Sequence, residues 1–156
     1  MIASRELAPA LLLLACSRRK AAGVKRGRAW DIYDGRVFQV LKKALSDATE
    51  WQERVHVLIV SARYGVIGAG AIIESYEERL TPGLARRGGR LWAEGLRRAV
   101  AGNSYRAVHV NLGREYLRAL PNLVEVFPGA LIDWASGGIG ARNAQTRRWV
   151  LEQLRT

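Results

Sequence analysis

The segment LLLLACSRRK, residues 11–20, decides the fold of this chain. Four leucines and an alanine run without a polar interruption into Cys16, Ser17 and three basic side chains. An uninterrupted apolar run of this length is typical of a central parallel strand that is covered on both faces. Such strands present functional residues just past their carboxyl ends. We therefore predict a strand over residues 11–15 and a functional loop that starts at Ser17.

Apolar segments alternate with helical patterns along the rest of the chain. The other predicted strands are apolar or rich in β-branched residues, and they lie at residues 55–60, 105–110 and 123–127, with a loop or a short fifth strand at 130–134. The predicted helices repeat their apolar residues at helical spacing, and they lie at residues 35–45, 82–100, 114–120 and 141–154. This alternation indicates a three-layer α/β/α sandwich around a mainly parallel sheet of four or five strands. We expect one domain over residues 1–156, in which residues 1–9 are a short leader.

Two of the predicted helices carry local signals. Asp34 is a reasonable N-cap for the first helix, and Thr81 before a proline is a reasonable N-cap for the second. The residues of the second helix that we expect to face the core are Leu84, Leu91, Trp92 and Leu96. Residues 72–80 fit neither a strand nor a helix clearly, so the sequence assigns no element to them.

The composition points to a polyanionic partner. The chain has 156 residues, 49% of them hydrophobic, which is enough to bury a core of its own. Its 25 lysines and arginines exceed its 14 acidic residues and give a formal net charge of +11. Basic surfaces bind phosphates because counterions are released, so we expect a nucleic acid, DNA before RNA, with an anionic membrane surface second. A solubilising surface, or the ion-pair-rich surface of a heat-stable protein, is the alternative.

Several classes of protein are disfavoured by what the sequence lacks. A single cysteine and two scattered histidines allow no internal disulfide and no cysteine-based zinc site, so we expect no metal. There is no Walker loop, and we expect no cofactor. Residues 13–16 imitate a lipoprotein cleavage box, but Pro9 breaks the short apolar core before it. No run approaches the roughly 18 apolar residues that span a membrane, so we expect a cytoplasmic protein. We also expect the protein to be a monomer.

Small polar residues follow three of the predicted strands. Ser17, Ser61 and Asn111 each come at a strand end, beside a cation or a glycine. Ligands of open α/β sheets bind at the carboxyl edge, so we expect these side chains to converge there with the basic loop. The alternative is that small polar residues simply end strands. We interpret Cys16 as a packing residue, because no histidine base is placed to activate it.

Basic side chains and glycines offer phosphate contacts near this edge. The loop over residues 18–28 contains six basic residues and no acid, which suits a solvated loop that folds against phosphate. Glycines before the last helix could bring backbone N–H groups to an anion, although a plain tight turn fits them equally well. The candidate phosphate ligands are Arg18, Arg19, Lys25, Arg26, Arg28, Arg63, Gly138 and Gly140.

Acidic and aromatic side chains supply further candidates. Glu74 and Glu77 could act as a general base or stabilise a cationic transition state, or they could form a surface that pairs with arginine. Asp133 stands between an isoleucine and a tryptophan, which suits either a catalytic carboxylate or a structural pair. Tyrosines near strand ends can stack on bases, and those in this chain are Tyr33, Tyr64, Tyr76 and Tyr116.

The order of these motifs resembles a little-characterised bacterial and archaeal family. Its pattern is CS-x-x-K, then Y-x-x-x-x-F, then SA-K/R-Y/H-G-L, then an acid-P-Y-D segment. The matching segments here lie at residues 16–20, 33–38, 61–67 and 74–77, with Ser75 in place of the proline and Glu77 in place of the aspartate. More distantly, the pattern is similar to the YaaA peroxide-stress proteins, which bind DNA, and to a CS-x-x-K domain of tRNA-guanine transglycosylase relatives. The resemblance implies a fold similar to uracil-DNA glycosylases.

These observations make a DNA-acting enzyme the expected function, namely a DNA glycosylase that flips out and excises a damaged or modified base. Breaking an N-glycosidic bond needs a carboxylate for the cationic sugar and donors for the departing base. The candidate catalytic residues are Asp133, Glu74, Glu77 and Asn111, and the candidate substrate-binding residues are Ser17, Lys20, Ser61, Tyr64, Tyr76 and Tyr33. The alternative is a non-catalytic nucleic-acid-binding stress-response protein. An enzyme of free nucleotides or nucleosides fits the crevice but leaves the charge of +11 unexplained.

Overall fold

The computed structural model describes residues 8–77 and 82–155, and in this part of the chain a five-stranded sheet has the order β4-β3-β1-β6-β7. Its strands are β1 (Ala10–Ala15), β3 (Val55–Ser61), β4 (Gly65–Gly68), β6 (Ala107–Asn111) and β7 (Leu131–Trp134). β1 runs parallel to both β3 and β6, and β6 runs parallel to β7. β4 pairs antiparallel with β3 at one edge. A short antiparallel ribbon joins β2 (Arg26–Arg28) to β5 (Ile72–Glu74).

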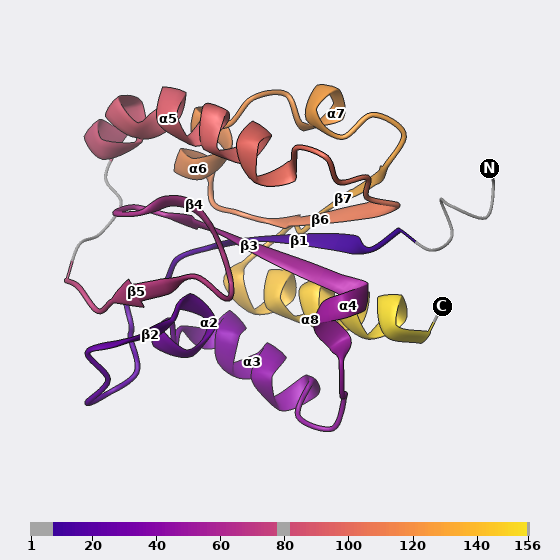
Figure 1. The fold of residues 1–156 in the computed structure, drawn as a ribbon, viewed down its shortest axis with the longest axis horizontal. Coiled ribbons are helices and arrows are strands. Elements are labelled where there is room, and N and C mark those ends of the chain that lie inside the picture. Colours follow the sequence, from indigo (N-terminus) through magenta and orange to yellow (C-terminus); the bar gives the residue numbers. More distant parts are fainter. Residues whose placement is uncertain (1–7, 78–81, 156) are drawn as a thin grey trace.

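Helices cover both faces of the sheet (Figure 1). One face carries α5 (Pro82–Val100), α6 (Arg114–Ala119) and α7 (Leu123–Val126). The other face carries α2 (Ala29–Ile32), α3 (Arg36–Ala44), α4 (Trp51–Arg54) and α8 (Ile139–Arg155). The predicted three-layer α/β/α sandwich with a mainly parallel sheet is therefore confirmed. Among the described residues, the structure contains no helix that is long and apolar enough to cross a membrane.

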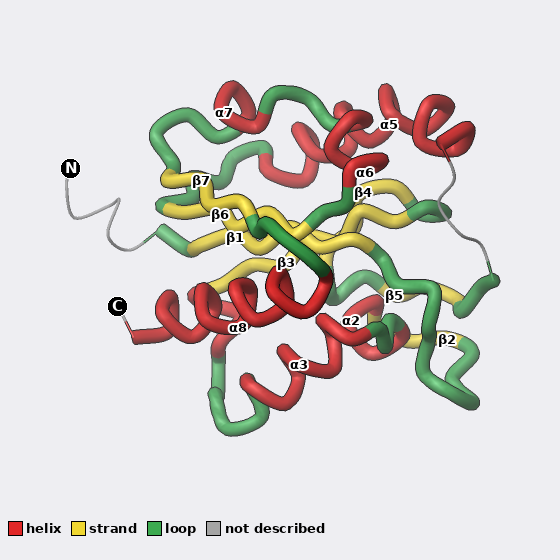
Figure 2. Tube along the Cα trace, turned by 180° about the vertical axis from the view of Figure 1, so that it is seen from behind, coloured by secondary structure: helices red, strands yellow, loops and turns green. Residues whose placement is uncertain are grey.

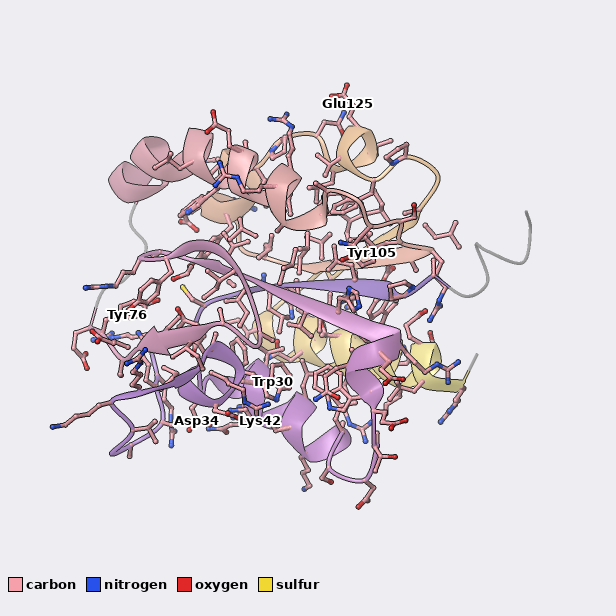
Figure 3. All side chains as sticks on the ribbon, in the orientation of Figure 1. Trp30, Asp34, Lys42, Tyr76, Tyr105 and Glu125 are labelled. Carbon is pink, nitrogen blue, oxygen red and sulfur yellow. The ribbon has the colours of Figure 1, made fainter. Side chains whose placement is uncertain are left out.

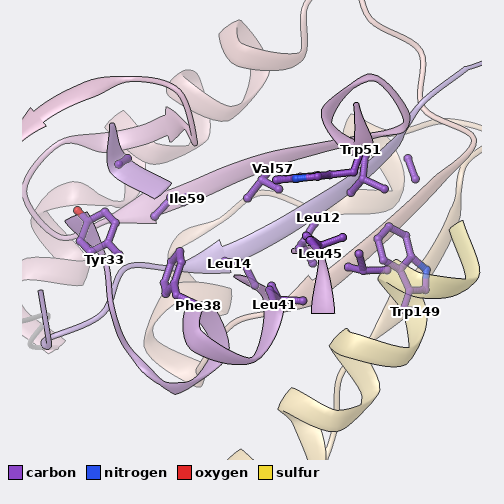
Figure 4. Packing of buried hydrophobic residues seen from close by; sticks show 14 of the residues in the cluster. Leu12, Leu14, Tyr33, Phe38, Leu41, Leu45, Trp51, Val57, Ile59 and Trp149 are labelled. Atoms are coloured by element: carbon purple, nitrogen blue, oxygen red, sulfur yellow. The ribbon is translucent and has the colours of Figure 1, made fainter. Parts of the chain in front are cut away.

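Both hydrophobic cores are built on β1. Leu12 and Leu14 face the layer of α3 and α8 (Figure 4), and Leu11 and Leu13 face the layer of α5 and α6. None of these four leucines is more than 1% exposed. Because side chains alternate between the faces of a strand, every position of β1 meets a core, which explains the absence of a polar residue. Burial of each leucine contributes about 1.5–3 kcal/mol.

The carboxyl ends of the parallel strands form the end of the sheet at which a ligand would bind. The chain leaves β1 toward α2 and α3 on one face, and it leaves β6 toward α6 on the other. The switch point of the topology therefore lies between β1 and β6. The ribbon of β2 and β5 lies at this same end, away from the C-terminal end of α8 (Figure 2).

The strand prediction for residues 123–127 is wrong. This segment contains helix α7, and the Asn122 side chain caps it by accepting a hydrogen bond from the Val124 N–H at 3.1 Å. A short apolar run is compatible with either a strand or a buried helical turn, so periodicity could not separate them. For residues 130–134 the sequence allows either a loop or a short fifth strand, and the structure contains strand β7 there. β4 has no counterpart in the prediction, because its four residues begin and end with glycine.

Two details of the predicted helices also differ. The N-cap of α3 is Gly35, and the predicted cap Asp34 instead places its carboxylate 3.5 Å from Arg19 Nε. In α5, Leu91 is 69% exposed rather than inward, whereas Trp92 is buried as predicted.

Three other predictions concern α5 and the residue before it. Leu96 is fully buried, as its helical spacing predicts. Thr81 and the side chain of Leu84 lie outside the described residues. Within the unassigned segment 72–80, the first three residues form β5.

Candidate functional site

A buried triangle of hydroxyl groups closes the carboxyl end of β3. The hydroxyls of Tyr33 and Tyr76 lie 2.6 Å apart, and they are 3.0 and 3.1 Å from Ser61 Oγ. Ser61 Oγ also accepts hydrogen bonds from the backbone N–H groups of Arg63 and Tyr64, at 3.2 and 3.0 Å. Tyr33 and Ser61 are fully buried. The triangle brings together three of the predicted substrate-binding residues and fixes the turn that follows β3.

Burial keeps the two phenols of this triangle protonated. It raises the pKa of Tyr33 and, more strongly, the pKa of Tyr76 above the ordinary value. Both side chains are therefore hydrogen-bonding groups at neutral pH and not bases. Because Tyr33 is fully buried, its ring offers no face on which a base could stack. The Tyr33 hydroxyl instead forms hydrogen bonds that hold the side chains of Ser61 and Tyr76 in position.

Tyr64 fastens β5 to the turn after β3. Its hydroxyl donates to the Glu74 carbonyl oxygen at 3.1 Å and accepts from the Glu74 N–H at 3.2 Å. Its ring meets Tyr76 edge to face, with the centroids 5.6 Å apart. The guanidinium of Arg63 lies 5.7 Å from the centroids of both rings. A cation and two aromatic rings therefore lie together beside β5, at the end of the sheet opposite Tyr105 (Figure 3).

Lys20 is held against the same aromatic group. Its backbone forms an antiparallel bridge with Tyr33, which orders the chain after β1. Its Nζ lies 4.2 Å from the centroid of the Tyr76 ring and donates a hydrogen bond to the Arg18 carbonyl oxygen at 3.0 Å. Partial burial lowers the pKa of Lys20, and the charge of Arg18 acts in the same direction. Cys16 and Glu77 oppose this shift without cancelling it.

A groove of about 680 Å³ opens beside Lys20. It is lined by the loop after β1, the start of β2, the end of β5 and the residues that follow β5. The charged side chains of this lining are Lys20, Lys25, Arg26, Glu74 and Glu77. Three cations and two carboxylates at one groove can bind a phosphate and also orient an uncharged polar group.

The basic side chains predicted to contact phosphate lie at the surface, and two of them, Lys25 and Arg26, line this groove. These side chains come from the loop after β1, from β2 and from the turn after β3. All of them are exposed, namely Arg18, Arg19, Lys25, Arg26, Arg28 and Arg63. Arg28 Nε lies 2.8 Å from Asp31 Oδ2, and Arg19 pairs with Asp34 at 3.5 Å. Exposed pairs of this kind contribute about 0–1 kcal/mol, so a phosphate can displace the carboxylate.

Ser17 braces the basic loop against α3. Its Oγ donates to the Arg19 carbonyl oxygen at 2.6 Å and accepts from the Gly35 N–H at 3.1 Å. A Cβ placed on Gly35 would lie 2.6 Å from the Ser17 Cβ, so this contact requires glycine at the start of α3. The hydrogen bonds of Ser17 therefore shape the loop rather than point to a ligand.

Cys16 sits at the switch point between β1 and β6. Its Sγ lies 3.2 Å from the Tyr116 hydroxyl, and the Ala62 N–H donates to it at 3.4 Å. Burial raises the pKa of Tyr116, which stacks on Trp92 with centroids 5.7 Å apart. Cys16 and Tyr116 thus join the two helical layers across this end of the sheet.

Asn111 and Asp133 belong to a separate polar chain beneath α8. Asn111 Nδ2 donates to Thr146 Oγ1 at 2.9 Å and to Asn143 Oδ1 at 3.3 Å. His109 continues the chain, with Nε2 at 2.8 Å from Thr146 Oγ1 and Nδ1 at 2.7 Å from Asp133 Oδ2. The structure therefore does not group Asp133 with Glu74 and Glu77 at the basic groove.

The sequence did not predict the hydrogen-bond partners of Asn111 and Asp133, which are His109, Asn143 and Thr146. One signal was available: in β6, His109 and Asn111 are two residues apart and therefore share a face of the strand. The other was the register, which sets His109 beside Asp133 and which no sequence pattern reveals. Asp133 also lines a different depression, of about 550 Å³, along α8.

The glycine-rich segment before α8 is open to solvent. Gly138 and Gly140 are exposed, and a Cβ on either would meet nothing within 4 Å. Gly137 has a φ of 89°, which favours glycine at the turn into the helix. Within the described part of the chain, no three His, Cys, Asp or Glu side chains are grouped so that they could hold a metal ion.

Comparisons with known proteins give the fold a relative and the chain a family. A solved structure described as AF0587, a protein of unknown function, matches 94% of this chain and 48% of its own with a TM-score of 0.54 at 14% identity. This chain thus spans about half the length of that structure, and the likeness shows the fold alone. No curated protein matches the chain. A family model described as a family of unknown function (DUF6884) matches residues 11–145.

Proposed function

The chain belongs to the DUF6884 family, and we propose that it binds DNA across the carboxyl edge of its sheet, with an extruded nucleotide in the groove beside Lys20. The observation that carries this proposal is the lining of the groove. Lys20, Lys25 and Arg26 line it, and the Arg63 guanidinium lies against the rings of Tyr64 and Tyr76 nearby. Cations that line a groove suit a DNA strand whose phosphates are bound while one nucleotide is turned out.

Charge and resemblance support the same proposal. The formal net charge of +11 favours polyanion binding through counterion release. The motifs that resemble those of the DNA-binding YaaA proteins and of the glycosylase-like domains include Lys20, Ser61 and Tyr76, which are in contact or close to one another in the structure. The proposed setting is the cytoplasm, and the proposed form of the protein is a monomer.

Salt-dependent binding tests the proposal. Fluorescence anisotropy with a labelled duplex and with the matching single strand should show that affinity falls linearly with salt on logarithmic axes. Replacing Lys25 and Arg26 together by alanine should reduce the magnitude of this slope by about 1–2, because each phosphate contact contributes about 0.9. Lys43→Ala, which removes one charge from the exposed last turn of α3, is the control and should change the slope little. Equal effects of both changes would contradict the groove as the binding site.

Hydrolysis of an N-glycosidic bond is the second candidate function, and one observation favours it. The carboxylates of Glu74 and Glu77 line the same groove as Lys20, so an acid could lie beside the sugar of an extruded nucleotide. Duplexes that contain uracil, oxidised bases or alkylated bases should then yield abasic product, and Glu77→Gln should slow that reaction about 100-fold or more. If every duplex is bound but none yields abasic product, the protein binds nucleic acid without this chemistry.

A further inference from the structure

An amine and a carboxylate lie in the lining of the same groove. Lys20 and Glu77 both line it, and the charge of Glu77 acts on the Lys20 amine. The backbone of Lys20 is fixed by its bridge to Tyr33, and its Nζ rests on the ring of Tyr76.

We propose that Lys20 is a nucleophile that forms an imine with the open-chain sugar aldehyde of an abasic site in DNA, and that Glu77 is the base for the strand cleavage that follows. The substrate class is a 2-deoxyribose aldehyde that lies between two phosphates. This inference rests on the proposed function, since the abasic strand must first bind along the basic loop. A baseless sugar can enter a groove of this kind without the energy of unstacking a base.

The reaction balances with water as the only co-reactant. The lone pair of the unprotonated Lys20 Nζ attacks C1′ of the aldehyde and forms a carbinolamine. The carbinolamine takes up one proton from solvent and loses one water, which leaves a protonated imine; the later hydrolysis of the imine returns that proton. The Glu77 carboxylate then takes a proton from C2′, the electron pair forms the C2′–C3′ double bond, and the C3′–O bond breaks. The departing phosphate becomes the 5′-phosphate end of the adjoining strand. Water hydrolyses the imine and frees Lys20.

The surroundings of the amine favour this role for Lys20 over Lys25. A lysine must lose its proton before it can attack, and partial burial together with Arg18 shifts Lys20 in that direction. Cys16 and Glu77 oppose this shift, but burial outweighs both of them. The face of the Tyr76 ring also favours the charged form. Lys25 lines the same groove, but its side chain is exposed. Lys43, which is exposed in the last turn of α3 and does not line the groove, serves as the control.

Borohydride trapping of the full chain on abasic DNA tests the inference. A labelled duplex with one abasic site is incubated with the protein and sodium borohydride, which reduces an imine to a stable covalent bond. The wild-type protein should give a covalent complex on a denaturing gel, with the adduct on Lys20 by mass spectrometry. Lys20→Arg keeps the charge but cannot form an imine, so it should bind the duplex and give no complex. Lys43→Arg should trap as the wild type does.

The outcomes separate this inference from the function on which it rests. Glu77→Gln should keep trapping but slow strand cleavage by about 100-fold. Undiminished trapping by Lys20→Arg, or an adduct on another amine, would overturn the role of Lys20. Undiminished cleavage by Glu77→Gln would overturn the role of Glu77. Tight duplex binding without any trapped complex would overturn the inference alone, whereas no binding to any DNA would overturn the proposed function.

Discussion

The Ser61 hydroxyl links two phenols and two backbone N–H groups at the end of β3. In Ser61→Ala, the N–H groups of Arg63 and Tyr64 lose their acceptor in a partly buried place. Such a loss costs about 1–3 kcal/mol, so the free energy of unfolding in urea should fall by that amount. Ser46→Ala removes an exposed hydroxyl that donates only to the Lys43 carbonyl oxygen, and it should change stability far less. Equal losses of stability in the two variants would mean that the hydroxyl triangle at β3 contributes little to the free energy of unfolding.

Gly35 has a steric reason to be glycine that a second substitution can relieve. Its φ of −67° suits any residue, but an added Cβ would lie 2.6 Å from the Ser17 Cβ. Gly35→Ala should therefore lower the free energy of unfolding by about 1–3 kcal/mol. In a Ser17→Gly background that loss should shrink by at least about 0.5 kcal/mol, because the clashing atom is gone. Gly68→Ala, whose Cβ would meet open space, is the control, and additive effects at 35 and 17 would refute the clash.

Single residues show how far the sequence can predict a site. Strand ends and the family resemblance point to Ser61 and Tyr76, and the structure places their hydroxyls 3.1 Å apart. Ser17 and Asn111 lie at the same edge of the sheet, yet their hydrogen bonds go to the loop and to α8. The direction of a side chain depends on its neighbours in space, and strand order alone does not reveal it.

At the scale of elements, the polar chain between β6 and α8 should make stability depend on pH. The ring of His109 is fully buried against Asp133, Thr146 and Trp149. Burial lowers the pKa of His109 below its unfolded value, although Asp133 opposes the shift. Below a pH of about 6.5 the unfolded chain therefore binds a proton that the folded chain does not, and the free energy of unfolding falls.

Urea titrations at two pH values check this sign. The midpoint should be lower at about pH 5 than at about pH 7.5, and His109→Gln should lose part of that difference. Burial also lowers the pKa of His56, which adds a change of the same sign. The comparison is therefore made in a His56→Gln background. A midpoint difference that is unchanged by His109→Gln would contradict this account.

Elements differ in how well their sequence predicts them. β1 is predictable because each of its side chains packs in one of the two cores, so all of its residues are apolar. An apolar run of this length is not found in a turn. α7 is not, because LVEVF has the length and composition of a strand, and only the Asn122 cap and the packing of Leu123 and Phe127 select a helix. β4 escaped prediction because GVIG is held by pairing with β3 rather than by its own pattern.

The whole molecule separates its basic groove from its polar chain. The groove lies at the ribbon of β2 and β5, beside β3, while the chain of Asn111, Thr146 and His109 lies between β6 and α8. Net charge could predict a polyanionic partner but not this division, which depends on strand order. The order β4-β3-β1-β6-β7 sets β1 between the two regions.

The central position of β1 also decides how the molecule opens. Because its leucines belong alternately to both cores, neither helical layer can separate without exposing side chains of the same strand. The layers should therefore unfold as one cooperative unit, and the backbone amides of residues 11–14 should exchange with deuterium only through global unfolding. Native-state hydrogen exchange in low denaturant should therefore give these amides the largest opening free energy. That value should equal the free energy of global unfolding. Amides of the β2–β5 ribbon should exchange far sooner, through local opening that leaves the sheet intact.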